Sequence, residues 1–282
     1  MRVVRGVSAM QALAGRLRRR YRSIGLVPTM GAFHDGHLSL IRASVSRYEA
    51  TIVSVFVNPL QFGPREDFRR YPRTLARDLC LARLAGVDVV FAPGTTQLYP
   101  DGFQTRVEVV ALTRRWEGRH RPGHFQGVAT VVTKLFTIVQ PTHTLFGQKD
   151  YQQALVVRQL IQDLNLPITL RILPTVREPD GLAMSSRNRY LSHSERQRAT
   201  VLYHALCQAR ARIRAGMRRS RPLVAQMRRV ILSQPHVHID YVGVVDATTL
   251  EPCERLRGRV ALLVAVRVGR VRLIDNLLVE VA

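Results

Sequence analysis

Apolar and polar residues follow two alternating patterns along the first 175 positions. Short runs of mostly β-branched or aromatic residues, bounded by Pro, Gly or Asn, are typical of strands, and the stretches between them repeat apolar residues at helical spacing. The predicted strands are Ile24–Val27, Thr51–Val57, Val87–Ala92, Thr144–Phe146 and Ile168–Leu173, and the predicted helices are about Leu38–Tyr48, Thr74–Ala85, Val128–Val139 and Tyr151–Asp163. Such alternation predicts an α/β fold, a parallel sheet with helices on both faces.

The pattern changes after the extended segment Pro174–Glu178. A polar loop through Asn188 leads to a long predicted helix, about Ser194–Ala215, which Ser194 would cap. The elements predicted after it are a helix at Pro222–Ser233 and strands near Val237–Val245, Val260–Val268 and Val271–Val279, the last two joined by a tight Gly269-Arg270 turn. Helices followed by an antiparallel meander predict a separate, smaller α+β domain, so we divide the chain into residues 1–175 and 176–282.

Composition excludes several classes of protein. Hydrophobic residues make up 46% and charged residues 22% of the 282 positions, as in ordinary globular proteins. No apolar run reaches the length of a membrane span, and Met1–Val7 lacks the apolar core of a signal peptide. The three cysteines, Cys80, Cys207 and Cys253, form no C-x-x-C pair, which disfavours a disulfide framework or a cysteine zinc site. We therefore expect a cytoplasmic protein without a membrane partner.

The net charge of +23 raises the question of nucleic-acid binding. The excess is spread along the chain, with 24 basic and 11 acidic residues up to Thr175 and 19 and 9 after it. Of the 43 basic residues 41 are Arg, which indicates a chain-wide preference for that residue. The local clusters Arg16–Arg22 and Arg210–Arg221 are interpreted as solvated helix faces. We expect no nucleic-acid partner.

Two histidines mark the candidate chemistry at the end of the first predicted strand. In Val27–His37 a Pro/Gly turn is followed by His34 and His37, three residues apart, just as a helix begins. Free N–H groups at a helix start favour an anion, and the imidazoles can donate to phosphate oxygens. The alternatives are a capping pair or a two-histidine metal site, for which the local sequence offers no third ligand. We favour phosphate binding.

Further polar segments follow other predicted strands or lie at the domain junction. Neither a Walker A loop nor a G-x-G-x-x-G motif is present. Phe146–Asp150 places Lys149 between a strand and a helix, where an ammonium group suits a phosphate. Asn58–Gly63 brings the amide of Gln61 after the second strand, and Met184–Arg187 combines two hydroxyls with a guanidinium. Arg121–Phe125 is as consistent with a structural turn as with a binding loop.

Five stretches together resemble the signature blocks of the pantothenate synthetase family. They are VPTMGAFHDGH, FVNPLQFGPREDFRRYPRT, RPGHFQGVATVV, FGQKDYQQ and TVREPDGLAMSSRNRYL, and they occur in the family's order. The resemblance covers the whole chain, less distinctively over the last 80 residues. The His-Asp-Gly-His segment alone indicates only the wider nucleotidyltransferase superfamily. Phe33 and Asp35 replace the usual Leu and Glu and conserve their character.

The resemblance implies a fold, partners and roles for individual residues. Residues 1–175 would form a Rossmann-like domain that binds ATP and pantoate, and residues 176–282 a lid-like domain, within a homodimer. Mg²⁺ would accompany ATP, and no resident metal is implied. Catalysis would depend on His34, His37 and Lys149, and pantoate and β-alanine would be bound with the help of Gln61 and Gln153. The implied ATP-binding residues are Met30, Gly31, Ala32, Phe33, His34, Asp35, Gly36, His37, Gly147, Gln148, Lys149, Asp150, Val176, Met184, Ser185, Ser186 and Arg187.

The implied reaction is the ATP-dependent condensation of pantoate with β-alanine through a pantoyl-adenylate, in the biosynthesis of pantothenate and coenzyme A. The residue types suit it, because an ionised carboxylate needs placement and charge stabilisation on the phosphates more than a strong base. Two alternatives stay open at this point. One is a nucleotidylyltransferase of the same superfamily, and the other is a basic RNA-binding protein.

Overall fold

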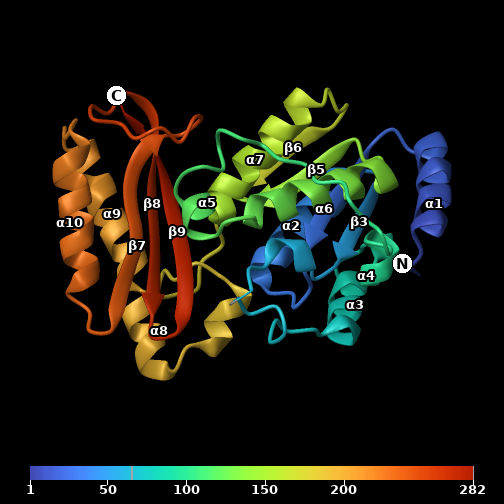
Figure 1. The fold of residues 1–282 in the computed structure, drawn as a ribbon, viewed down its shortest axis with the longest axis horizontal. Helices are drawn as coiled ribbons and strands as arrows, with labels where there is room; N and C mark the ends of the chain where they lie inside the picture. The colour runs from blue at the N-terminus through green and yellow to red at the C-terminus, as the bar shows by residue number, and fades with distance from the viewer. Residues whose placement is uncertain (65, 282) are drawn as a thin grey trace. The chain divides into compact units, whose positions relative to one another are not determined.

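The computed structural model describes residues 1–64 and 66–281 and forms two compact units (Figure 1). Unit 1 comprises Met1–Gly147 and Gln153–Pro174, and unit 2 comprises Gln148–Gln152 and Thr175–Ala282. The short segment Gln148–Gln152, which precedes and opens a helix of unit 1, thus groups with the second unit. The segment contains Lys149.

Unit 1 is built on a six-stranded parallel sheet in the order β1-β4-β3-β2-β5-β6. The strands are β1 Arg2–Val4, β2 Ile24–Thr29, β3 Ala50–Val55, β4 Val89–Phe91, β5 His143–Gly147 and β6 Thr169–Leu173. Five of them were predicted from the sequence. The edge strand β1 was not, since three residues are too few for a periodic signal; it pairs with β4 from Arg2 opposite Val89 to Val4 opposite Phe91.

Helices cover both faces of this sheet, as predicted. The helices in this part of the chain are α1 Val7–Arg20, α2 Asp35–Val45, α3 Leu75–Leu84, α4 Thr95–Leu98, α5 Glu117–His120, α6 His124–Val139 and α7 Tyr151–Asp163, with the 3₁₀ turn η1 Pro59–Gln61 after β3. Buried side chains of α1, α6 and α7 share one apolar cluster with Leu26 and Ile52. Those of α2 and α3 share another with Val27 and Val53. Neighbouring strand residues thus enter opposite layers, as the pleat requires.

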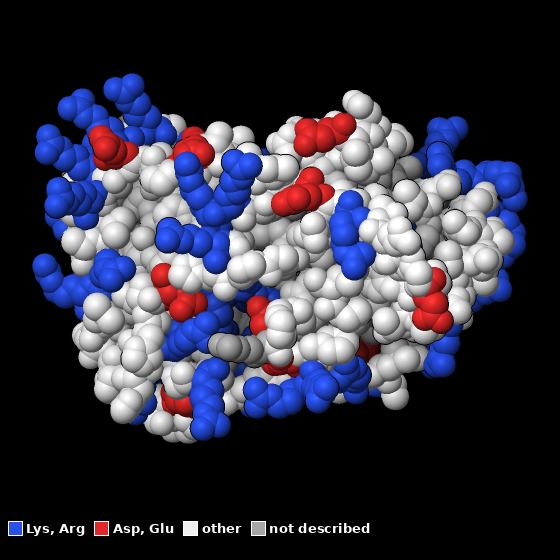
Figure 2. Space-filling view, in the orientation of Figure 1, with Lys and Arg blue, Asp and Glu red and all other residues white. Residues whose placement is uncertain are grey.

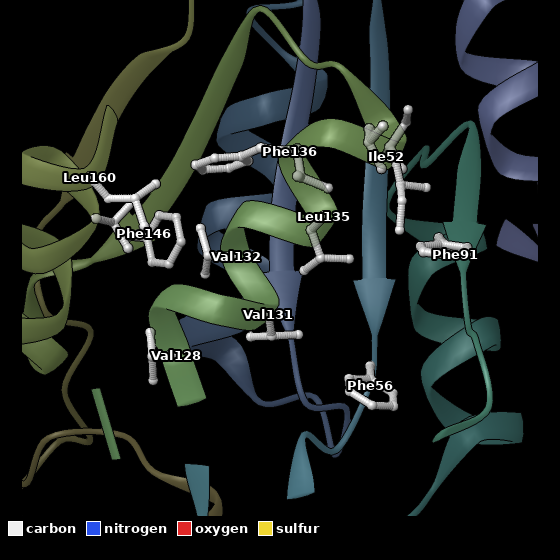
Figure 3. Packing of buried hydrophobic residues seen from close by; sticks show 14 of the residues in the cluster. Ile52, Phe56, Phe91, Val128, Val131, Val132, Leu135, Phe136, Phe146 and Leu160 are labelled. Carbon is white, nitrogen blue, oxygen red and sulfur yellow. The ribbon is translucent and has the colours of Figure 1, made fainter. Parts of the chain in front are cut away.

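The core of the first layer centres on α6. Figure 3 shows Val128, Val132 and Phe136 of this helix near Phe146 and Leu160, and Leu135 on the side of Ile52. All of these side chains are at most 5% exposed. Because α6 packs directly on the strands, its N-terminal turn is held in place, and the turn η1 that follows β3 packs against this helix.

Unit 2 contains a three-stranded antiparallel sheet in the order β7-β8-β9. Its strands are β7 Val237–Asp246, β8 Gly258–Val268 and β9 Val271–Val281, its helices α8 His193–Ala199, α9 Val201–Arg214 and α10 Ser220–Leu232, and its 3₁₀ turns η2 Gln148–Asp150 and η3 Ser186–Tyr190. The predicted two-residue turn joins β8 to β9, with Val268 opposite Val271. One apolar cluster unites α9 and α10 with the sheet.

The single long helix predicted for Ser194–Ala215 is wrong in two details. It is divided into α8 and α9 at Thr200, whose Oγ1 donates to the carbonyl of Gln197 at 2.7 Å and competes with the helical ladder. The helix is also capped by Ser192, and not by Ser194. Ser192 and Glu195 form a reciprocal capping box, which the S-x-x-E spacing could have indicated.

Candidate active site

Three neighbouring strands of unit 1 end in segments that carry predicted site residues. In the order β3-β2-β5, β3 leads to Asn58, β2 leads to Met30 and β5 ends at Gly147. Because these strands are parallel, all three exits lie at one edge of the sheet. From β2 the chain continues to β3 and β4 on one side of β2 and later adds β5 and β6 on its other side. The direction in which strands are added therefore reverses next to β2. Open α/β sheets bind their ligands at such an edge.

His34 and His37 cap the N-terminus of α2 through their Nδ1 atoms. The N–H of Gly36 donates to His34 Nδ1 at 3.2 Å, and the N–H of His34 donates to His37 Nδ1 at 3.4 Å. The two ring centroids are 4.0 Å apart. A neutral imidazole that accepts at Nδ1 carries its proton on Nε2. The capping alternative is therefore realised, and the neutral ring that accepts at Nδ1 is a donor at Nε2, which suits an anion.

Asp78, in the first turn of α3, fixes the loop that precedes these histidines. Its carboxylate is 1% exposed and accepts from the N–H groups of Ala32 and Phe33, both at 2.9 Å. Gly31 has a φ of +81°, and a Cβ there would lie 3.0 Å from Asp78 Oδ2. Only glycine suits both that conformation and that approach. Sequence analysis did not single out Asp78, because nothing in its local pattern distinguishes it from a surface acid.

Gln61 is oriented by a buried neighbour. Asn58, 1% exposed, donates through Nδ2 to Gln61 Oε1 at 3.1 Å and to the carbonyl of Gly127 at 3.0 Å, while its Oδ1 accepts from Tyr99 Oη at 2.8 Å. Since Asn58 holds the oxygen of the Gln61 amide, the Nε2 end points elsewhere, and it lies 3.3 Å from Met30 Sδ. Two predicted site residues are thus brought together, and Gln61 presents donors.

Gly127 lets α6 pack against the turn that carries Gln61. A Cβ at this position would fall on the carbonyl group of Leu60 and the backbone nitrogen of Gln61. These are backbone atoms, which cannot move aside as a flexible side chain could. The glycine is therefore required by close approach, although its φ lies outside the left-handed region.

Arg121 and His124 hold the same turn from its other side. His124 Nδ1 lies 2.8 Å from the carbonyl oxygen of Gln61, and Arg121 Nη1 lies 3.0 Å from His124 Nε2. Because the guanidinium can only donate, His124 accepts at Nε2 and donates at Nδ1. Arg121 also donates to both oxygens of Glu66, at 2.6 and 2.7 Å, and pairs with Glu117 at 3.5 Å. In the Arg121–Phe125 segment, left open by sequence, the partly buried Arg121 and the buried His124 brace Gln61.

Burial sets the protonation of this brace. Burial, together with the positive charge of Arg121, lowers the pKa of His124 to about 4, so the ring is neutral near pH 7. For Glu66, burial alone would raise the pKa, but its hydrogen bonds and charge pairing with Arg121 bring the pKa below its usual value. Arg121 and Glu66 are accordingly an ion pair, and His124 is the neutral link between that pair and Gln61.

In unit 2, Lys149 and Asp150 occupy the turn η2. Lys149 Nζ lies 3.1 Å from Asp150 Oδ1, and the lysine side chain is 21% exposed. Val176 and Met184 are joined by a hydrogen bond from the N–H of Met184 to the carbonyl of Val176 at 3.0 Å. Ser185 then caps η3 by accepting from the N–H of Arg187 at 3.3 Å.

The predicted residues are distributed over both units. Unit 1 holds Met30–His37, Gln61, Gly147 and Gln153, and unit 2 holds Gln148–Asp150, Val176 and Met184–Arg187. Gln153 lies half-buried in the first turn of α7. The structure brings three pairs of them into contact: Gln61 Nε2 lies beside Met30 Sδ, the rings of His34 and His37 lie against each other, and Met184 is hydrogen-bonded to Val176. Sequence reasoning missed Asn58, Asp78 and, in unit 2, Asn276, whose side chain bonds to η2.

Comparison with known proteins identifies the family. The family model described as Pantoate-beta-alanine ligase matches residues 2–278. The chain belongs to the pantoate–β-alanine ligase family. A relative from Moorella thermoacetica, named pantothenate synthetase, is 52% identical over 281 residues, which span 100% of this chain and 99% of that protein. The family resemblance read from the five sequence stretches is thus confirmed.

Solved structures of pantoate–β-alanine ligases share the fold. The crystal structure of the ligase from Thermus thermophilus has a TM-score of 0.94 and 48% identity, covering 98% of this chain and 99% of that one. The Francisella tularensis ligase, described as complexed with β-γ ATP and β-alanine, has a TM-score of 0.81 and 34% identity, covering 99% and 97%. Both similarities extend over nearly the whole chain. They therefore support the fold of both units, the parallel sheet with its helices and the smaller antiparallel sheet.

Proposed function

We propose that this chain condenses (R)-pantoate with β-alanine at the expense of ATP, releasing pantothenate, AMP and diphosphate through a pantoyl-adenylate. The observation that carries this proposal is the match to the pantoate–β-alanine ligase family over residues 2–278. It is supported by the relative that is described as bound to an ATP species and β-alanine. The donors that His34, His37 and Gln61 present at the carboxyl edge of the sheet also support the proposal.

In the first step, an oxygen of the pantoate carboxylate forms a bond to the α-phosphorus of ATP, and diphosphate leaves with the bonding electrons. We propose that His34 and His37, which are donors at Nε2, and Lys149 stabilise the charge that builds on the phosphates. Gln61 would donate from Nε2 to pantoate, and Gln153 would be its partner in substrate binding. Neutral amides orient a carboxylate without quenching it as a nucleophile.

In the second step, the neutral amine of β-alanine attacks the acyl carbon, loses a proton, and AMP leaves. We propose that Met30–His37 and Gly147–Asp150 hold the nucleotide, with Asp150 accepting from ribose hydroxyls. Val176 would contact adenine, and Met184–Arg187 would complete the phosphate clamp. The turn that joins Val176 to Met184 supports this assignment, because it keeps the two segments adjacent.

Magnesium would arrive with the triphosphate. Within residues 1–64 and 66–281, no group of three or more His, Cys, Asp or Glu side chains is arranged to hold a metal ion. Mg²⁺ usually keeps several waters and is bound largely through substrate phosphates. We accordingly propose that Mg²⁺ is held through the phosphates of ATP.

We further propose that the protein acts in the cytoplasm as a homodimer and has no nucleic-acid partner. On the face drawn in Figure 2, basic side chains are scattered over many elements, with acidic ones among them. This distribution favours a general Arg preference over one nucleic-acid groove. Among the described residues, no helix combines the length and apolar character that a membrane crossing requires.

Product analysis tests the proposal. The purified protein is incubated with ATP, Mg²⁺, pantoate and β-alanine, and the products are identified by mass spectrometry, with each substrate omitted in turn. Pantothenate and AMP should form only when all are present. A product that retains a nucleotidyl group would indicate a nucleotidylyltransferase instead, and tight, steeply salt-dependent RNA binding without amide formation would indicate the RNA-binding alternative.

A further inference from the structure

A buried asparagine far along the chain holds the turn that carries Lys149. Asn276, in β9, is 2% exposed. Its Nδ2 donates to the carbonyl oxygens of Gln148 and Lys149, both at 2.9 Å, and its Oδ1 accepts from Gln148 Nε2 at 3.2 Å. The two carbonyls can only accept, so the NH₂ end of the amide must face them.

These two carbonyls belong to the peptide groups on either side of the Lys149 Cα. Each peptide group is planar, so the backbone at Lys149 has only two soft dihedrals, φ and ψ, and they relate one plane to the other. A single amide that binds both planes therefore restricts both dihedrals. The direction of the Lys149 Cα–Cβ bond follows from them. Asn276 thus controls where the lysine side chain starts.

Asn276 is itself held on both backbone atoms. Its N–H donates to Asp275 Oδ1 at 2.7 Å, and its carbonyl accepts from Arg177 Nη2 at 3.4 Å. Arg177 donates to the two oxygens of Asp275 at 2.6 and 2.9 Å and lies 3.9 Å from the centre of the Tyr203 ring. Burial raises the pKa of Asp275, and the bonds from Arg177 oppose that rise. A buried network with its groups paired in this way is rigid.

We propose that Asn276 is a positioning residue for the reaction, which aims the Lys149 ammonium group by clamping the two peptide groups beside it. The inference rests on the proposed role of Lys149 in stabilising phosphate charge. Asn276 itself touches neither substrate nor the reacting atoms. Its contribution should therefore appear in kcat and should depend on the presence of the lysine.

A double-mutant cycle tests this dependence. Asn276→Leu keeps the approximate size of the side chain and removes its hydrogen bonds. It should lower kcat roughly 10- to 100-fold, the scale for a small misplacement of a catalytic group, with a much smaller change in the KM for ATP. In a Lys149→Ala background the same substitution should cost less than about twofold, because coupled residues are not additive. Equal losses in both backgrounds would overturn the proposal.

Two further variants separate positioning from general destabilisation. Leu273→Ala removes a buried side chain of the same strand that belongs to the apolar cluster of α9, α10 and the sheet, a cluster that includes no residue of η2. We expect its folded fraction to keep nearly the kcat of the unmodified protein. A loss as large as that of Asn276→Leu would show that any damage to β9 suffices and would reject the proposal. Asn276→Ser offers a smaller polar replacement in case the leucine variant does not fold, and it should show the same dependence on Lys149.

Hydrogen exchange examines the clamp without reference to the reaction. In Asn276→Leu or Asn276→Ser, the amides of Lys149–Gln152 should exchange about 10-fold faster or more, which corresponds to at least about 1.4 kcal/mol of lost local protection. Leu273→Ala should leave that segment close to the unmodified protein. Unchanged exchange in the Asn276 variants would overturn the clamp. Absence of pantothenate formation by the unmodified protein would instead overturn the proposed function, and the exchange result would still decide the clamp.

Discussion

Acidification should destabilise unit 1 through His124. The unfolded chain binds a proton at this ring near pH 6.5, whereas burial delays protonation in the folded protein to about pH 4. Between these values the unfolded state holds more protons, so the free energy of unfolding falls as the pH falls. The loss begins near pH 6.5 and is complete below about pH 4. A difference of about 2.5 pKa units corresponds to about 3 kcal/mol.

His124→Asn isolates this contribution. The asparagine amide can replace Nδ1–H as a donor to the Gln61 carbonyl, but it does not titrate. We expect the variant to be less stable at pH 7, since Arg121 Nη1 loses His124 Nε2 as one of its acceptors. We also expect it to lose about 3 kcal/mol less between pH 7 and pH 4. Titration of other groups cancels in the comparison. His238→Gln, at an exposed position of β7, is the matched control and should retain the pH dependence of the unmodified protein.

Urea unfolding followed by Trp116 fluorescence gives the measurement. Trp116 is the single tryptophan of the chain and directly precedes Glu117 of the brace, so its signal reports unit 1. Free energies are obtained by linear extrapolation at several pH values between 4 and 7. If His124→Asn loses as much stability on acidification as the unmodified protein, His124 does not resist protonation, and the neutral link between Arg121 and Gln61 is wrong.

Two further predictions concern the residues of the candidate site. Gly127→Ala should lower the free energy of unfolding by about 1–3 kcal/mol and raise the KM for pantoate, because the added methyl group displaces the turn that carries Gln61; an unchanged KM would mean that the turn does not contact pantoate. His37→Ala and Lys149→Ala should each lower kcat by about 10² to 10³. Lys149→Ala should leave the unfolding midpoint nearly unchanged, whereas His37→Ala also removes the acceptor of the His34 N–H at the start of α2 and should cost about 1 kcal/mol. A variant that unfolds yet keeps its activity per folded molecule would assign that residue to structure.

The parts of the fold that sequence predicted are those with local causes. The spacing of apolar residues in a strand or helix depends only on residues close in sequence. The sequence therefore predicted α7 at Tyr151–Asp163, the bounds that the structure shows. The position of His34 at a helix start likewise follows from the glycines and the apolar spacing around it. The split at Thr200 was missed because a single hydroxyl that bonds one turn back leaves no trace in the apolar pattern.

The supporting residues of the site could not be predicted, because their partners are distant in sequence. Asp78 binds a backbone amide 46 positions away, Asn58 binds a carbonyl 69 positions away, and Asn276 binds one 127 positions away. Such pairs are created by strand order and by the grouping of η2 with β9, and no local window contains them. The family resemblance supplied the roles of the signature residues, while the atoms that hold those residues came from the structure.

The fate of the pantoate carboxylate oxygens tests the central claim most directly. The protein is supplied with ATP, Mg²⁺, β-alanine and pantoate labelled with ¹⁸O in the carboxylate, and the labelled products are analysed by mass spectrometry. If the carboxylate attacks the α-phosphorus, AMP must leave with one labelled oxygen, and pantothenate must retain the other. Label in inorganic phosphate, or AMP without label, would show that no pantoyl-adenylate forms and would contradict the proposed mechanism.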